Sequence, residues 1–249
     1  MKQQAETPPV FSGKRILVIG GTGGIGAALA KKLLDAGGKV SVIGRHNPFP
    51  AKDNPAPERH AAVFLPLNLD DPACLPDLTA AAAHTDVLCV VRGPFLQKPL
   101  HETSGAEWMQ TVFANLAVPG AAVSAALPGM RSRRWGRILL FGGTRTEAVR
   151  GFATNAAYAA AKTGISSLVR SVAENYAAEG ISCTGICPGF TDTEYLTAET
   201  RAQLAAKIPG GKLIPAEAAA SLGMRLLSDF CLNGCILTPD CGWTPRTAG

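Results

Sequence analysis

Short apolar runs rich in valine, isoleucine and leucine recur along the chain, and each ends at glycine or at a polar turn. Runs of this length without alternation are typical of parallel strands that are buried on both faces. They predict seven strands, at residues 15–19, 40–43, 61–65, 86–91, 137–141, 181–187 and 234–237.

Longer stretches rich in alanine and leucine lie between these runs and favour helices. Four of the expected helices cover residues 27–36, 75–83, 198–207 and 215–229. A fifth opens at the capping box Ser104-x-x-Glu107, and a sixth begins at residue 156, where Thr154 or Asn155 would cap it. Because strands and helices alternate, we expect an α/β fold, a single doubly wound Rossmann-type parallel sheet of about seven strands with helices on both faces.

The domain organisation predicted from this pattern is simple. Residues 1–13 are a polar lead-in, and residues 14–249 form one domain without internal repeats. Four prolines in the stretch 46–60 predict an extended loop where the alternation would place a helix.

Composition narrows the class of protein. We expect no apolar run to be long enough to cross a bilayer, and no signal peptide pattern opens the chain, so the sequence predicts a cytoplasmic protein that does not bind membranes. The seven cysteines form no Cys-x-x-Cys pair, which predicts buried thiols in a reducing compartment and no metal site. A net charge of +5 suits an anionic cofactor or substrate but is too diffuse to indicate nucleic acid.

A glycine-rich turn, Gly20-Gly21-Thr22-Gly23-Gly24-Ile25-Gly26, joins the first strand to the first helix. Small residues let the backbone approach a pyrophosphate, which rests on the positive helix N-terminus. Three glycine spacings fit this turn at once, so it predicts dinucleotide binding without identifying a family.

The residues that end the second strand bear on the choice of cofactor. An acidic residue there would hold the ribose 2′-hydroxyl of NAD, but Gly44 and Arg45 stand in its place. A guanidinium fork suits the 2′-phosphate of NADP. We therefore expect NADP(H), with a solvated loop arginine as the alternative for Arg45.

Tyr158 and Lys162 lie four residues apart in an alanine-rich helix, so the phenol and the ammonium should point into the same space. A neighbouring cation favours phenolate, which predicts that the pKa of Tyr158 falls from about 10 towards neutrality. A phenol of this kind is a general acid or base.

Asn115 precedes Pro119 by four residues in an earlier helix. Proline has no amide for the Asn115 carbonyl, so the helix should be bent there and the carbonyl free to hold a water molecule. Such a bend can also be purely structural.

Together these motifs resemble the short-chain dehydrogenase/reductase family over essentially the whole chain. Four features in the expected order carry the resemblance: Gly20-x-x-x-Gly24-Ile25-Gly26, Asn115 in a helix, Tyr158-x-x-x-Lys162, and Pro188-Gly189-x-x-x-Thr193. They select the third of the glycine spacings.

The resemblance implies a carbonyl reductase or alcohol dehydrogenase in which Tyr158 transfers the proton. It implies that Lys162 lowers the pKa of Tyr158 and binds the nicotinamide ribose, and that Asn115 holds a water molecule linked to Lys162. It also implies that the cofactor is bound by the glycine turn, including Thr22 and Ile25, and by Asn68, Leu69, Gly93, Pro188, Gly189 and Thr193. Residues from about 190 to 212 would cover the substrate.

Three departures from the family pattern stand out. The residue before the first glycine is Ile19 instead of threonine, and the family's Asn-Asn-Ala-Gly is Val90-Val91-Arg92-Gly93. The family's catalytic serine aligns with Gly143, which has no hydroxyl.

A nearby threonine could replace the missing serine hydroxyl. Thr144 lies fourteen residues before Tyr158 and can donate to a carbonyl, and Thr146 is the alternative. Losing the donor would cost about 2 to 4 kcal/mol of transition-state stabilisation. The competing hypothesis is therefore a low-activity family member that serves as a binding or scaffold subunit of a hetero-oligomer.

The resemblance also indicates partners. The cluster Arg131, Arg133, Arg134 and Arg137 lies where acyl-carrier-protein reductases of the family meet their acidic carrier, although it could equally be a solvated helix end. The substrate is expected to be a small carbonyl or alcohol compound, possibly bound to a carrier. Pairing through the Asn115 and Tyr158 helices would give a homodimer or homotetramer.

Overall fold

The computed structural model of the chain describes residues 10–47 and 62–243. Its main sheet has seven parallel strands in the order β3-β2-β1-β4-β5-β6-β9. The strands are β1 (Arg15–Ile19), β2 (Lys39–Gly44), β3 (Val63–Pro66), β4 (Val87–Val90), β5 (Gly136–Phe141), β6 (Ile181–Ile186) and β9 (Ile236–Leu237). The predicted fold class and strands are confirmed, whereas most of the lead-in and of the proline-rich loop lies outside the described residues.

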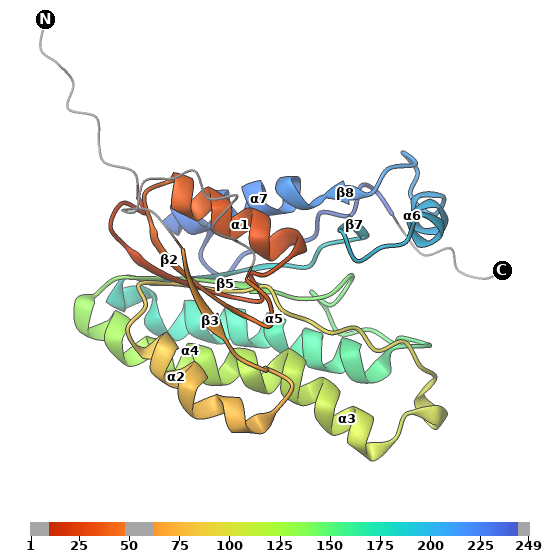
Figure 1. Cartoon of the computed structure of the whole chain (residues 1–249), viewed down its shortest axis with the longest axis horizontal. Helices are drawn as coiled ribbons and strands as arrows, with labels where there is room; N and C mark the ends of the chain where they lie inside the picture. The colour runs from red at the N-terminus through yellow and green to blue at the C-terminus, as the bar shows by residue number, and fades with distance from the viewer. Residues whose placement is uncertain (1–9, 48–61, 244–249) are drawn as a thin grey trace, which may run out of the picture.

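Helices cover both faces of this sheet, as Figure 1 shows. Helices α1 (Gly24–Asp35) and α7 (Ala216–Ser228) pack together on one face, where Leu29, Leu33 and Leu226 are buried. The other face carries α2 (Leu75–Ala83), α4 (Val118–Arg133) and α5 (Ala156–Tyr176) over a second apolar core. The strands are apolar on both faces because both faces are covered.

The helix that carries Asn115 is irregular where the sequence predicted a bend. Helix α3 (Gly105–Val112) opens at the predicted capping box, in which the Ser104 hydroxyl and the Glu107 carboxylate each bind the other's backbone N–H. A π-turn, η4 (Phe113–Ala117), then joins α3 to α4, and the Val118 N–H reaches back to the carbonyl of Phe113. Single π-turns of this kind occur frequently at functional sites.

This continuous helical run is also long enough to cross a membrane. Its 29 residues from Gly105 to Arg133 pass that test by length and composition, which the sequence analysis did not foresee. The run nevertheless packs on the sheet, where Ala122, Val123 and Met130 are buried. The apolar face of this helical run is therefore explained by its packing in the core of the domain.

Helix α5 carries Tyr158 and Lys162 and begins without the predicted side-chain cap. Asn155 occupies the N-cap position, but its side chain makes no capping hydrogen bond. The Asn155 carbonyl instead accepts from the Ala159 N–H at 2.9 Å. Five alanines among its first six residues give the helix high intrinsic propensity, so it does not depend on that cap.

A small second sheet forms after β6. Strand β7 (Thr191–Asp192) pairs in parallel with β8 (Ile214–Pro215), and α6 (Ala198–Ala205) lies between them in the chain. An ion pair of 2.8 Å between Arg201 and Asp192 ties α6 back to β7. The remaining short 3₁₀ turns are η2 (Pro72–Cys74), η3 (Leu100–Glu102), η5 (Ala177–Glu179) and η6 (Phe230–Leu232).

One prediction from residue type needs correction, and another stays a prediction. Three arginines of the cluster are exposed, although Arg131 pairs with Glu179, Arg133 pairs with Asp86, and Arg134 donates to the Ala178 carbonyl, so contact with an acidic carrier stays a prediction. All seven cysteines are free thiols, but Cys231 and Cys241 are exposed and Cys235 is only partly buried. These three lie on either side of the edge strand β9 in the chain. The described residues contain no cluster of metal-ligating side chains.

Candidate active site

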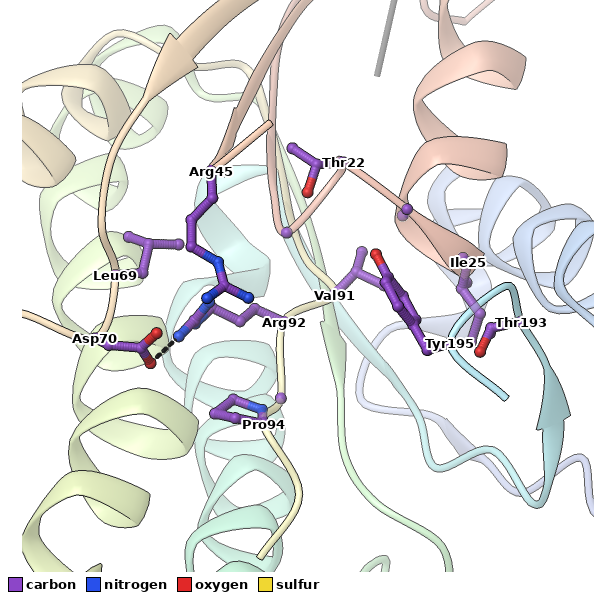
Figure 2. Close-up of a pocket in the computed structure, with 16 residues that line it drawn as sticks. Thr22, Ile25, Arg45, Leu69, Asp70, Val91, Arg92, Pro94, Thr193 and Tyr195 are labelled. Atoms are coloured by element: carbon purple, nitrogen blue, oxygen red, sulfur yellow. Dashed lines mark hydrogen bonds and ion pairs between the residues drawn. The ribbon is translucent and has the colours of Figure 1, made fainter. Parts of the chain in front are cut away.

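A cleft lies at the carboxyl ends of the strands, where the order of the sheet reverses between β1 and β4. Ligands of doubly wound sheets bind at such a switch point. The cleft is lined by the glycine turn, by Gly44, Arg45, Leu69 and Asp70, and by residues 91–94, Thr193 and Tyr195. Figure 2 shows these side chains around the cleft. A smaller cavity continues past Ile25, Val91 and Gly93 to Tyr158 and Lys162.

Close packing explains the glycines of the turn. A Cβ on Gly26 would stand 2.2 Å from the carbonyl oxygen of Gly20, so a side chain there would separate helix α1 from the turn. Gly20 has φ +80°, and a Cβ on it would lie 2.8 Å from the Arg92 backbone. Gly24 also has a positive φ, of +49°. The third spacing, Gly20-x-x-x-Gly24-x-Gly26, is therefore the one that the backbone requires.

An anionic oxygen already rests on this turn. The Gly24 N–H, at the start of α1, donates to both carboxylate oxygens of Glu194, at 2.8 and 3.1 Å. The positive end of a helix stabilises such a charge. The turn therefore offers a phosphate group the N–H donor and the positive helix end that it needs, so these residues fit the pyrophosphate of a dinucleotide.

The end of β2 has no room for an acidic side chain. A Cβ on Gly44 would lie 2.1 Å from the Thr22 methyl group, so Thr22 occupies the space of any side chain there. Arg45 is exposed and lines the cleft. In Figure 2 its guanidinium extends from the end of β2 over the cleft.

The two residues predicted to lie on the adenine side differ in their positions. Leu69 is buried and lines the cleft, whereas Asn68 is exposed, does not line it, and accepts a hydrogen bond from the Asp70 N–H at 3.2 Å. Asn68 forms this local turn because an asparagine side chain readily bonds the backbone two residues on. Asp70 lines the cleft in its place.

Arg92 is a residue of the cleft that the sequence analysis recorded only as a departure. Its side chain is mostly buried and forms an ion pair with Asp70, which Figure 2 shows as a dashed line. Its Nε is buried without a hydrogen-bond partner. The signal that could have identified it is an arginine directly after a buried strand that ends at the cleft, where the family has alanine.

Lys162 and Tyr158 line the same cavity, as predicted. Lys162 is 1% exposed, and its Nζ donates to the carbonyl oxygens of Arg92 at 3.0 Å and Phe141 at 2.9 Å. Burial lowers the pKa of Lys162 to about 7. Two carbonyl acceptors match the two N–H groups of a neutral amine, so this geometry accommodates both charge states.

The predicted fall in the pKa of Tyr158 is wrong for this structure. Burial raises the pKa of the phenol well above its usual value, and the nearby Cys187 thiol adds to the rise. Lys162 does not counteract this, because its Nζ is directed to the two carbonyls and its own charge is disfavoured by burial. The Phe95 ring packs edge-on against Tyr158, with ring centroids 4.9 Å apart.

Asn115 is fully buried beside this pair. Its Nδ2 donates to the carbonyls of Pro94 at 3.1 Å and Thr111 at 3.0 Å, while its Oδ1 has no hydrogen-bond partner. A Cβ on Gly93 would lie 2.7 Å from the Lys162 Nζ and 3.1 Å from this Oδ1. Gly93 thus lets the lysine and the unpaired amide oxygen approach the same point.

The position of the missing serine lies against the phenol. A Cβ on Gly143 would stand 2.9 Å from the Tyr158 hydroxyl and 2.8 Å from Cε1 of its ring. Thr144 lines the same cavity, and its hydroxyl donates to the Pro188 carbonyl at 2.9 Å. Thr146 is fully buried and bonds the backbone of Gly143. Of the two threonines, only Thr144 reaches the cavity.

The predicted Pro188, Gly189 and Thr193 divide between the two cavities. Pro188 and Gly189 lie at the Tyr158 end, whereas Thr193 lines the glycine-turn cleft. Gly189 approaches the chain near the C-terminus, since a Cβ on it would be 2.9 Å from the Asp240 Cα. Glu194 and Tyr195, which were predicted to cover the substrate, lie on the glycine turn instead.

A parallel sheet with a glycine turn at its switch point, next to a tyrosine and a buried lysine that line one cavity, defines a dinucleotide-dependent oxidoreductase. The family model described as short chain dehydrogenase matches residues 14–204. The chain belongs to the short-chain dehydrogenase family.

Named relatives agree with this assignment. The chain is 32% identical to the 3-oxoacyl-acyl-carrier-protein reductase FabG of Salmonella typhimurium over 227 residues, 88% of this chain and 91% of that one. It is 33% identical to the cis-4-hydroxycyclohexanecarboxylate dehydrogenase of Sinomonas cyclohexanicum over 248 residues, 94% of this chain and 98% of that one.

A solved structure of a putative NAD(P)-dependent gluconate 5-dehydrogenase from Beutenbergia cavernae, with bound NADP, superposes with a TM-score of 0.83. It is 26% identical and covers 95% of this chain and 99% of that one. The comparisons thus support an oxidoreductase that interconverts a carbonyl and an alcohol.

Proposed function

We propose that the protein is an NADP(H)-dependent reductase that converts a carbonyl to an alcohol, or the reverse, with Tyr158 as general acid/base. The observation that carries the proposal is the continuity of the two cavities. Ile25, Val91 and Gly93 line both, so a dinucleotide held on the glycine turn would end beside the Tyr158 phenol.

NADPH, when bound, supplies a hydride to the carbonyl carbon. The Tyr158 hydroxyl gives its proton to the carbonyl oxygen, so the product is an alcohol and the residue becomes a phenolate. The raised pKa of Tyr158 keeps the phenol protonated at neutral pH, which is the state that reduction requires. In the reverse direction the phenolate accepts the proton of the alcohol.

Lys162 is suited to return the lost proton. A phenolate beside it would favour the ammonium form, and its pKa of about 7 allows it to gain and lose a proton near neutrality. The unpaired Asn115 Oδ1 offers an acceptor next to Lys162. We propose that this side-chain oxygen, instead of the Asn115 backbone carbonyl that the sequence predicts, holds the water molecule that connects Lys162 to solvent.

Thr144 is proposed as the donor to the substrate oxygen. It lines the cavity, and its hydroxyl can rotate from the Pro188 carbonyl towards a carbonyl oxygen held beside Tyr158. Gly143 and the buried Thr146 supply no such group.

NADP(H) is proposed over NAD(H) for a steric and an electrostatic reason. Thr22 excludes a side chain at Gly44, and Arg45 lines the cleft beside it. An acid that would bind the 2′-hydroxyl of NAD has no space there, whereas a guanidinium can bind a 2′-phosphate.

The substrate, assembly and location are proposed from family membership. The substrate is a small carbonyl or alcohol compound, either free or bound to a carrier protein, as the name of the FabG relative indicates for that enzyme. We propose a cytoplasmic homodimer or homotetramer. Pairing would use the α4 and α5 surfaces that remain accessible, such as Ala160, because Ala122 and Ala157 are buried within the chain.

A binding or scaffold role is the second candidate. It is favoured by Gly143, which supplies no hydroxyl, and by the Thr144 hydroxyl, which is bonded to Pro188. A scaffold subunit of a hetero-oligomer would tolerate both features.

Turnover distinguishes the two functions. The purified protein is mixed with NADPH and a panel of ketones while nicotinamide absorbance is followed, with Tyr158→Phe as the control. We expect oxidation of NADPH with at least one ketone and a loss of about 10² to 10⁴ in rate in the variant. NADPH binding without turnover across the panel would favour the scaffold, and equal rates for both proteins would exclude Tyr158 as the acid.

A further inference from the structure

The segment that follows β7 lies over the glycine turn. The Glu194 carboxylate accepts from the Gly24 N–H at 2.8 and 3.1 Å, although 170 residues separate the two in sequence. A Cβ on Gly23 would stand 1.8 Å from the Tyr195 hydroxyl and 2.3 Å from Glu194 Oε1. A Cβ on Gly24 would be 3.0 Å from the Thr193 methyl group. Three consecutive side chains therefore cover the start of α1.

These contacts occupy the position that a dinucleotide needs. The first N–H groups of α1 have no partner within the helix, and they are the groups on which a pyrophosphate would rest. Glu194 supplies two oxygens and a negative charge to one of them, as a phosphate would. A single N–H cannot serve both anions at full strength, and the two charges repel each other at this distance.

Apart from its contacts with the glycine turn, the covering segment is anchored chiefly at its two ends. Thr191 and Asp192 pair with β8, and Asp192 is bound to Arg201 of α6. The Thr197 hydroxyl caps α6 by accepting from the Thr200 N–H at 3.1 Å. Between these anchors, Glu194 and Tyr195 are exposed and hold the segment on the turn. The side chains of Glu194 and Tyr195 can therefore leave the turn without breaking the β7–β8 pairing or the cap of α6.

We propose that Glu194 is an internal phosphate mimic that competes with the dinucleotide for the Gly24 N–H and so sets the affinity for the cofactor. Cofactor binding displaces the Glu194 carboxylate and lifts Tyr195 from Gly23. The exchange of one anion for another keeps the helix terminus satisfied in both states. This inference rests on the proposed function, because it takes the glycine turn to be the cofactor site.

Removal of the competing charge should tighten binding. Glu194→Gln keeps a carbonyl oxygen for the Gly24 N–H but removes the charge, and Glu194→Ala removes both. Glu199→Gln is the matched control, because this exposed carboxylate on α6 is five residues away and bonds only Gln203 among the contacts seen. The three variants and the unmodified protein are titrated with NADPH by fluorescence, and association rates are measured by stopped flow.

We expect both Glu194 variants to lower the Kd for NADPH by about threefold to tenfold and to raise the association rate, on the scale of a charge at a helix terminus. Glu199→Gln should match the unmodified protein. Unchanged or weaker NADPH binding in both Glu194 variants would overturn the proposal, because Glu194 would then be a bystander or a cofactor ligand.

A second probe separates this proposal from the proposed function. If the unmodified protein binds neither NADPH nor NADH, the proposed function fails, and inorganic pyrophosphate then replaces the dinucleotide in calorimetric titrations. Tighter pyrophosphate binding by Glu194→Ala than by the unmodified protein and Glu199→Gln would still support the mimic. Equal or absent pyrophosphate binding in all of them would overturn it.

Discussion

Backbone groups make the contacts at the glycine-turn end of the cleft, whereas side chains make them at the Tyr158 end. Gly20, Gly24 and Gly26 fix the turn through positive φ angles and close packing, and the Gly24 N–H binds a carboxylate. At the other end Tyr158 lines the cavity from helix α5, and the buried Lys162 is held by two carbonyl acceptors. The first end binds a charged group through its backbone, whereas the second presents individual side chains.

This difference explains why the glycine spacing is complete while the catalytic serine is missing. The backbone of the turn requires its glycines. The Tyr158 end depends on individual hydroxyls and can lose one, as Gly143 shows, because Thr144 lines the same cavity. We therefore expect changes at the Tyr158 end to alter the rate of the reaction, and changes at the glycine-turn end to alter the choice of cofactor.

The largest effect after loss of Tyr158 is expected at Thr144. Thr144→Val keeps the shape of the side chain and removes its hydroxyl. If Thr144 donates to the substrate oxygen, the rate of carbonyl reduction should fall about a hundredfold while the Kd for NADPH is unchanged. Steady-state kinetics and fluorescence titration measure the two quantities.

Thr146→Val is the control for this change, but it removes hydrogen bonds to the Gly143 backbone and so must be judged with its melting temperature. Undiminished turnover in Thr144→Val would show that the site works without a third donor.

A change at Arg45 should alter the choice of cofactor and leave the chemistry intact. Arg45→Ala should weaken NADPH binding by about 1 to 3 kcal/mol and leave NADH binding nearly unchanged, because only NADPH carries the 2′-phosphate. Titration of both nucleotides checks this, with the exposed Arg150→Ala as a control for net charge. Equal affinities for NADH and NADPH in the unmodified protein would contradict the role of Arg45.

The last effect concerns stability instead of activity, and it is small for any single step in pH. The pKa of Lys162 is about 7 in the folded chain and about 10.5 when unfolded, so between these values the unfolded state binds more protons at this residue. Its contribution to the free energy of unfolding therefore rises with pH over this window, by up to about 1.4 kcal/mol per pH unit, and is lost as the pH falls through 7.

Urea unfolding at several pH values measures this contribution as the difference between the unmodified protein and Lys162→Met. Subtraction removes the opposing effects of Tyr158 and Cys187, whose pKa values are raised in the folded chain. The exposed Lys31→Met serves as the control. A difference that does not grow between pH 7 and pH 9 would show that Lys162 remains charged in the fold.

The sequence by itself determined the parallel sheet, the glycine turn and the pairing of Tyr158 with Lys162. These follow from local rules, since apolar runs form buried strands and residues four apart share a helix face. The same rules place the irregular helix at Asn115 and put Arg45 at the end of the second strand.

Only the tertiary structure decided the electrostatics and the long-range contacts. The pKa of Tyr158 rises because burial outweighs its helical neighbour, whose Nζ is taken up by carbonyls from β5 and the β4 loop. The Arg92 ion pair with Asp70 and the Glu194 contact with Gly24 join segments 22 and 170 residues apart. Desolvation and contacts of this range depend on how the whole chain packs, so no local pattern of residues encodes them.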